Sequence, residues 1–329
     1  MIPPHPALPR HGGDLAAAKR RYGTPPRPWL DLSTGINPRS YPLPSLPASC
    51  WTDLPDADAE AALLAAAAAC YGTPPQAGVV AAAGTQALIQ WLPRLRPPSR
   101  VAVLGPTYAE HAAAWAAAGH QVAEVATLDA AAGADVVVVV NPNNPDGRIF
   151  PFAALEGAAA RARLLVVDEA FADVAPEASI AAWAGRPGLV ILRSFGKFFG
   201  LAGLRLGFAL TDRDTAGRLR AAQGGWAVAG PAMAVGTGAL SDRAWISDTR
   251  RWLKERAERL DVVLGAAGIE VLGGTTLFRL ARCSDAQRLA DHLGRQGILT
   301  RAFAYEPEWL RVGLPGDDDG LERLRLALA

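Results

Sequence analysis

One lysine in an apolar, glycine-containing stretch is the residue of this chain best suited to covalent chemistry. The chain has three lysines, Lys19, Lys197 and Lys254. Lys197 follows a Ser-Phe-Gly string and precedes two phenylalanines, whereas Lys19 stands beside Arg20 and Lys254 lies within the arginine-rich stretch 250–256. A desolvated lysine has a lowered pKa and a nucleophilic amine, as a Schiff base requires. The alternative is a side chain that reaches solvent past its neighbours, but the flanking Ser194 and Arg205 favour the covalent role.

Residues that could bind a ligand follow two other apolar runs. Gly84-Thr85-Gln86 opens an expected helix, where free backbone N–H groups form a natural phosphate site, although an ordinary N-cap is the simpler interpretation. Tyr108 stands where an aromatic ring could stack on a planar ligand, and packing at a strand end is an equal alternative. Each of these signals is weak when it is taken alone.

Amides and a carboxylate follow two further apolar runs. The segment 141–147 reads Asn-Pro-Asn-Asn-Pro-Asp-Gly, which is dense turn chemistry, and an amide donor aimed at a ligand is plausible there. Asp168 follows a buried run, where a carboxylate is costly unless a cation or hydrogen-bond donors pair with it. The sequence offers no evident partner for Asp168 except a cationic ligand. A metal site is disfavoured because no cluster of His or Cys lies nearby.

Short apolar runs that alternate with helical stretches must position these residues. Continuous apolar strands between helices indicate an α/β fold with a mostly parallel seven-stranded sheet covered on both faces. In such sheets, ligands bind beyond the carboxyl ends of the strands. The expected strands are Val79–Ala83, Val101–Leu104, Gln121–Val125, Val136–Val140, Leu164–Val167, Val190–Leu192 and Phe208–Leu210.

Three domains are expected from the change of pattern along the chain. Residues 1–45 are Pro-rich and predict an arm with one short helix, residues 46–212 predict the large domain, and residues 213–329 predict a smaller α+β domain. In the last of these, a long charged helix over 242–267 precedes short strands, including one over 298–301, and two more helices.

Composition excludes several classes of function. With 329 residues and a net charge of +1, the chain has no field that would attract nucleic acid or an anionic membrane. Its three cysteines are far apart and fit a reduced cytoplasm, and no apolar run is long enough to span a bilayer. The strings around Gly196 and Gly200 match neither a P-loop nor a dinucleotide fingerprint.

The ordered set of motifs resembles the aspartate-aminotransferase superfamily, the fold-type-I enzymes that use pyridoxal phosphate (PLP). The resemblance covers nearly the whole chain and implies that PLP is the cofactor and that the enzyme is a homodimer. It rests on Gly84-Thr85, Tyr108, Asn144-Pro145-Asp146-Gly147, Asp168, Ser194-Phe195-Gly196-Lys197 and Arg205.

The resemblance implies a role for each matching residue. Lys197 would carry PLP as a Schiff base, and Asp168 would pair with the protonated pyridine nitrogen, which makes the ring an electron sink. Asn144 would bond the phenolic oxygen of PLP, and Tyr108 would stack on its ring. The phosphate would be held by Gly84, Thr85, Ser194 and Arg205. Arg311 would bind the substrate carboxylate.

Two branches of the superfamily are especially similar to this chain. Histidinol-phosphate aminotransferases share its Asn-Pro-Asn-Asn-Pro and Leu-Ala-Gly-Leu-Arg strings. The threonine-phosphate decarboxylases of cobalamin biosynthesis are closer in three places: His11-Gly12-Gly13, the segment from Asp31 to Pro38, and Phe171, where most aminotransferases have a tyrosine. This second resemblance implies substrate-binding roles for His11, Asn37, Arg301 and Arg311.

The implied reaction is decarboxylation of L-threonine O-3-phosphate to 1-aminopropan-2-ol O-phosphate. Two alternatives stay open: a histidinol-phosphate aminotransferase, and a non-catalytic regulator with the PLP fold, which would usually carry a DNA-binding domain that residues 1–45 are too short to form. Two departures from the family pattern are Phe171, which cannot bond the phenolic oxygen, and Leu54, near the expected place of a tyrosine that reaches the partner subunit's cofactor.

Overall fold

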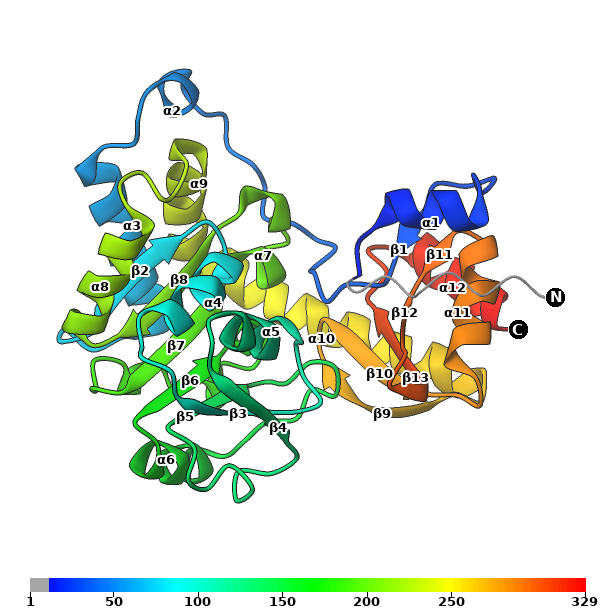
Figure 1. The fold of residues 1–329 in the computed structure, drawn as a ribbon. Helices are drawn as coiled ribbons and strands as arrows, with labels where there is room; N and C mark the ends of the chain where they lie inside the picture. Colours follow the sequence, from blue (N-terminus) through cyan, green and yellow to red (C-terminus); the bar gives the residue numbers. More distant parts are fainter. Residues whose placement is uncertain (1–11) are drawn as a thin grey trace. The chain divides into compact units, whose positions relative to one another are not determined.

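The protein divides into two compact units. The computed structural model describes residues 12–329; one unit comprises residues 40–248, and the other comprises residues 12–39 and 249–329. The boundaries expected from the sequence, at 45/46 and 212/213, stay predictions about domains. Helix α10 (Arg243–Ala266) contains the boundary at 248/249. Figure 1 labels the elements of both units.

A seven-stranded sheet organises the unit of residues 40–248. Its strand order is β2-β8-β7-β6-β5-β3-β4, and every pair is parallel except the two pairs that involve β8. The predicted mostly parallel sheet is therefore confirmed. Its strands are β2 (Gly78–Ala82), β3 (Arg100–Leu104), β4 (Gln121–Val125), β5 (Val136–Val140), β6 (Leu164–Asp168), β7 (Leu189–Ser194) and β8 (Gly207–Thr211).

Helices surround this sheet, as the alternating pattern predicts. One face of the sheet packs against α4, α5 and α8, which contribute Leu88, Trp115 and Leu219 to an apolar core. On the opposite face, Tyr71 of α3 packs edge-on against Phe208 of β8 at 5.7 Å between ring centroids. The helices of this unit are α2 (Ser49–Thr52), α3 (Ala57–Tyr71), α4 (Thr85–Arg94), α5 (Glu110–Ala117), α6 (Phe152–Arg161), α7 (Phe195–Phe198), α8 (Arg213–Gln223) and α9 (Gly230–Ser241), with short 3-10 helices η1 (Ala172–Val174), η2 (Pro176–Ala178), η3 (Ala181–Trp183) and η4 (Ala202–Leu204).

The second unit combines the N-terminal arm with the C-terminal segment. Its four-stranded antiparallel sheet has the order β12-β13-β10-β9, and a separate parallel pair joins β1 to β11. The elements are α1 (Leu15–Tyr22), β1 (Leu30–Asp31), β9 (Glu270–Thr275), β10 (Phe278–Arg282), α11 (Ala286–Arg295), β11 (Ile298–Leu299), β12 (Arg301–Phe303), β13 (Glu306–Gly313) and α12 (Asp318–Leu328). Across residues 12–329, no helix is long and apolar enough to cross a membrane.

One expected strand is divided in the structure. The sequence predicts a single strand over 298–301, but Ile298–Leu299 pairs with β1 of the arm, whereas Arg301–Phe303 pairs with β13. Each half has a buried apolar position, Ile298 in the first and Ala302 in the second, so the sequence pattern alone does not separate them. The break between them depends on the arm, which supplies the partner strand for the first half.

Candidate functional site

The predicted cofactor residues of the larger unit lie at one edge of its sheet. Strands β3, β5, β6 and β7 are parallel, so their carboxyl ends meet at the same edge. Gly207, the first residue of β8, pairs with Ala82 at the end of β2 and with Ser194 at the end of β7. The residues that follow β2 and those that precede β8 therefore reach this edge as well.

A glycine brings the guanidinium of Arg205 close to the start of α4. Gly84 has a φ of 82° and a ψ of 160°, and a Cβ at this position would lie 2.8 Å from Nη2 of Arg205. Gly207 is also required, since its Cβ would lie 2.5 Å from the backbone nitrogen of Thr85. Helix N-termini with free N–H groups bind phosphate, and a guanidinium adds charge. Residues more than a hundred positions apart thus form a compact cluster, here called the anion cradle, whose donors and charge suit an anion.

Asp168 is held by a histidine that sequence analysis did not identify. The Asp168 side chain is 4% exposed, and its Oδ2 lies 2.8 Å from Nε2 of His111 on α5. Its Oδ1 accepts a hydrogen bond from the backbone N–H of Ala170 at 3.0 Å. The sequence offered no evident partner for Asp168 except a cationic ligand, and the structure corrects this point, because His111 already contacts the carboxylate. The apolar pattern and the motifs give no signal for this contact, although His111 follows Tyr108 by three residues at the start of α5.

The next residue, Glu169, belongs to a separate buried ion pair. Successive side chains at the end of a strand point to opposite faces of the sheet, and Glu169 bonds Arg193 at 2.7 Å between Oε2 and Nη1. Arg193 also bonds Asp173 at 2.5 Å, and its guanidinium lies 4.3 Å from the centroid of the Tyr71 ring. The two adjacent carboxylates thus lie in different environments, and of the two only Asp168 faces α5.

Lys197 lies near the ring of Phe171, the residue that stands where the resemblance would place a tyrosine. It is half-buried in α7, and its Nζ lies 5.8 Å from the centroid of the buried Phe171 ring. Ser194, at the end of β7, is 8% exposed. The amine of Lys197 therefore lies near an apolar ring that carries no hydroxyl.

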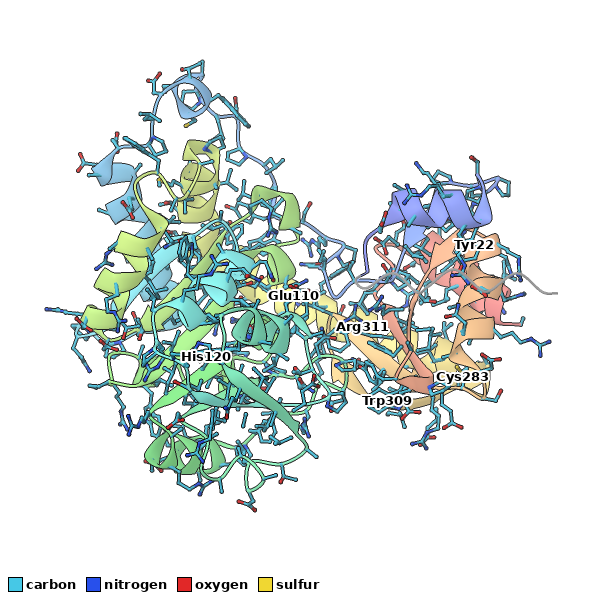
Figure 2. The ribbon with its side chains drawn as sticks, in the orientation of Figure 1. Tyr22, Glu110, His120, Cys283, Trp309 and Arg311 are labelled. Carbon is cyan, nitrogen blue, oxygen red and sulfur yellow. The ribbon has the colours of Figure 1, made fainter. Side chains whose placement is uncertain are left out.

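The asparagine-rich turn and Tyr108 are organised by side-chain hydrogen bonds. Asn141 binds the backbone of Ala178 and Phe150, and Asn143 binds Thr107, Pro106 and Asp146. Two of the amides thus stabilise the turn, and Asn144 lies half-buried beside them. The Tyr108 hydroxyl donates to Oε1 of Gln86 at 3.1 Å, and Nε2 of Gln86 donates to Glu110, the residue labelled on α5 in Figure 2.

Two arginines face each other in the smaller unit. Arg301 of β12 and Arg311 of β13 are registered partners in an antiparallel pair, and Arg311 is also labelled in Figure 2. Burial lowers the pKa of Arg301, and burial together with the charge of Arg301 lowers the pKa of Arg311 to about 10. Arg311 therefore stays charged at neutral pH. Like charges directly opposite each other are destabilising, so an anion near both side chains would offset their repulsion.

The remaining predicted substrate residues have different outcomes. Asn37 is 2% exposed in the same unit as the two arginines, and its Oδ1 accepts a hydrogen bond from the backbone N–H of Arg39 at 2.9 Å. Arg311 donates from Nη2 to the backbone oxygen of Ser33 at 2.6 Å. His11 lies outside the described residues. The structure therefore brings Asn37, Arg301 and Arg311 into one unit, and their roles stay predictions.

The residues of the larger unit fit pyridoxal phosphate. The anion cradle at Gly84 and Arg205 suits the phosphate, and a buried carboxylate suits a pyridinium. A half-buried lysine at the same edge suits an aldehyde that forms a Schiff base. Among residues 12–329, no group of three or more His, Cys, Asp or Glu side chains is placed to hold a metal ion.

Comparisons with known proteins show the family of this chain. Residues 48–328 match the family described as aminotransferase class I and II. The chain is 47% identical over 325 residues to a threonine-phosphate decarboxylase of Pseudomonas aeruginosa, a match that covers 97% of this chain and 96% of that protein. A threonine-phosphate decarboxylase of a Sinorhizobium species is 45% identical over 331 residues, which cover 97% of each chain.

A solved structure supports the fold assignment. The histidinol-phosphate aminotransferase of Sinorhizobium meliloti, solved in complex with pyridoxal-5'-phosphate, superposes with a TM-score of 0.83. The match covers 100% of this chain and 96% of that chain, at 22% sequence identity. At this level of identity the likeness shows a shared fold, and the substrate has to be inferred from the residues of the site.

Proposed function

Because the chain belongs to the aminotransferase class I and II family, which depends on pyridoxal phosphate, we propose that it decarboxylates L-threonine O-3-phosphate. The product is (R)-1-aminopropan-2-ol O-phosphate, a precursor in cobalamin biosynthesis. The relatives at 45% and 47% identity over nearly the whole chain carry the name of this activity. The structural observation that carries the proposal is the registered pair Arg301 and Arg311.

The two arginines match the two anionic groups of this substrate. Threonine phosphate carries a carboxylate and a phosphate, and a planar guanidinium binds either group through two parallel hydrogen bonds. We assign the carboxylate to Arg311 and the phosphate to Arg301, with His11 and Asn37 as further contacts. A substrate held at both ends keeps the bond to its carboxylate in one orientation, and this orientation selects decarboxylation over removal of the Cα proton.

The cofactor residues have distinct tasks in the proposed reaction. Lys197 binds PLP covalently, and Gly84, Thr85, Ser194 and Arg205 hold its phosphate. Asn144 and Tyr108 orient its ring, and Asp168 pairs with the ring nitrogen. When bound, PLP supplies an electron sink for the electron pair of the breaking bond between Cα and the carboxylate.

His111 and the backbone N–H of Ala170 fix both carboxylate oxygens of Asp168, and this orients the carboxylate for its partner on the cofactor. Lys197 is assigned the return of a proton to Cα after CO2 leaves. The carboxylate of the substrate is then replaced by one hydrogen, and no keto acid is consumed.

One assay distinguishes the proposal from its main alternative. Purified enzyme is incubated with L-threonine O-3-phosphate without any keto acid, and CO2 release is measured, with Lys197→Ala as the inactive control. The expected result is release of CO2 in proportion to amine product. No CO2 from threonine phosphate, together with transamination of histidinol phosphate by 2-oxoglutarate, would overturn the proposal in favour of an aminotransferase.

We further propose a homodimer that uses the surface around α2. Three large apolar side chains lie exposed within a short segment: Leu43 at 68%, Trp51 at 70% and Leu54 at 68%. Exposed apolar groups that gather in one segment are typical of a protein interface. Light scattering should give the mass of a dimer, and Trp51→Glu should shift the protein to monomer, whereas Val262→Glu at an exposed position of α10 should not. A wild-type monomer that is active at the assay concentration would contradict the dimer.

We also retain a cytoplasmic location as a proposal. Cys50, Cys70 and Cys283 are not joined to one another by disulfides in the part of the chain that the structure describes. Thiols of this kind persist in a reducing compartment.

A further inference from the structure

A buried serine of the N-terminal arm joins several elements of the smaller unit. Ser33 is 2% exposed, and its hydroxyl donates to Oδ1 of Asp31 at 2.6 Å and accepts from the backbone N–H of Gly13 at 2.8 Å. The backbone N–H of Ser33 also donates to Oδ1 of Asp31, at 2.9 Å. Its carbonyl oxygen accepts from Nη2 of Arg311 at 2.6 Å. One residue thus bonds the arm at two places and an arginine 278 positions away.

Close backbone approaches surround Ser33 on two sides. A Cβ at Gly12 would lie 2.2 Å from the carbonyl oxygen of Ser33, so only glycine allows this contact. The backbone N–H of Gly313 donates to the oxygen of Leu32 at 2.7 Å, and a Cβ at Gly313 would lie 2.5 Å from the oxygen of Thr34. Strand β13 is therefore joined to the arm at both Arg311 and Gly313, directly beside Ser33.

We propose that Ser33 is a positioning residue that sets the place of the Arg311 guanidinium through its own carbonyl oxygen. This inference rests on the proposed function, in which Arg311 binds the substrate carboxylate. The two bonds from Ser33 to Asp31 form a local turn of the kind in which an aspartate binds the residue two positions later. That turn fixes the peptide whose oxygen receives the guanidinium. Without it, the carbonyl of residue 33 gains freedom, and the arginine loses a defined partner.

The effect should appear in substrate binding. Ser33→Ala removes a side chain that does not touch the substrate in this proposal, so an effect on KM must pass through Arg311. We expect KM for L-threonine O-3-phosphate to rise about 10-fold, with kcat within about threefold of wild type. The matched control is Thr211→Ala, which removes another buried hydroxyl, bonded at 2.6 Å to the oxygen of Leu189 in the other unit. It should lower thermal stability without a change in KM.

A double-mutant cycle tests whether Ser33 acts through Arg311. Arg311→Lys removes the planar fork, and Ser33→Ala should add less than about twofold to KM in that background, because residues that act through one contact are not additive. Asp31 provides an independent pair of variants. Asp31→Ala should resemble Ser33→Ala, whereas Asp31→Asn keeps an acceptor oxygen and should stay within about threefold of the wild-type KM.

The outcomes separate this inference from the proposed function. If the wild-type enzyme releases no CO2 from threonine phosphate, the proposed function fails. If the wild type is active and Ser33→Ala keeps the wild-type KM, the positioning role is overturned. It is also overturned if Ser33→Ala raises KM as much in the Arg311→Lys background as it does in the wild type. Should Ser33→Ala not fold, the Asp31 pair decides: equal KM values for Asp31→Ala and Asp31→Asn would overturn it, and rescue by Asp31→Asn would support it.

Discussion

Substitution of Gly84 by alanine should damage the cofactor cradle in a measurable way. With φ at 82° and ψ at 160°, Gly84 occupies a backbone region that is almost restricted to glycine. An alanine there costs about 1–3 kcal/mol of folding free energy. The added Cβ would also lie 2.8 Å from Nη2 of Arg205, and because this atom ends a flexible side chain, the guanidinium should move away.

Displacement of Arg205 should weaken PLP binding beyond the loss of stability. A charged hydrogen bond contributes about 1.5–3 kcal/mol, which corresponds to roughly a 10- to 150-fold rise in the dissociation constant of PLP. Dialysed apoenzyme can be titrated with PLP and followed by absorbance. Urea denaturation of the apoenzyme measures the free energy of unfolding separately, without the contribution of the cofactor.

Gly217→Ala is the matched control. Gly217 is exposed within α8, and a Cβ there would have no atom within 4 Å. Alanine should stabilise this helix by up to about 1 kcal/mol and leave PLP affinity unchanged. The reasoning would be refuted if Gly84→Ala matched Gly217→Ala in both stability and PLP affinity.

Three further predictions concern the chemistry of the site. Borohydride should fix the cofactor to Lys197, and peptide mapping that finds the label on Lys19 or Lys254 would contradict the assignment. Asp168→Ala should abolish turnover. His111→Phe removes the partner at 2.8 Å and should lower kcat by about 10- to 150-fold, while the protein still binds PLP. A His111→Phe enzyme with normal kcat would show that the N–H of Ala170 suffices to hold the carboxylate. Arg301→Ala should lower kcat/KM for threonine phosphate by roughly 10- to 150-fold, and unphosphorylated threonine should be a poor substrate in kcat as well as in KM; equal turnover of threonine and its phosphate would reject the role of the phosphate.

Local sequence determined most elements of the larger unit. The five valines of β5 are predicted and observed over the same residues, Val136–Val140, because a strand covered on both faces needs a continuous apolar run. Lys197 can be singled out equally directly, since the other two lysines lie in arginine-rich stretches, and its role stays a prediction. These features depend on near neighbours in the chain, which is why the sequence alone reveals them. The residues that hold PLP could be proposed from the ordered motifs, and their roles stay predictions.

Tertiary structure decided which distant groups meet. His111 and Asp168 are 57 positions apart, and neither the apolar pattern nor the motifs indicated their 2.8 Å contact. The division of 298–303 into β11 and β12 likewise requires the arm as a pairing partner. The bond between Ser33 and Arg311 spans 278 positions. Hydrogen bonds of this kind carry no periodic signal, because they depend on where two separately folded segments come together rather than on the residues beside them in the chain.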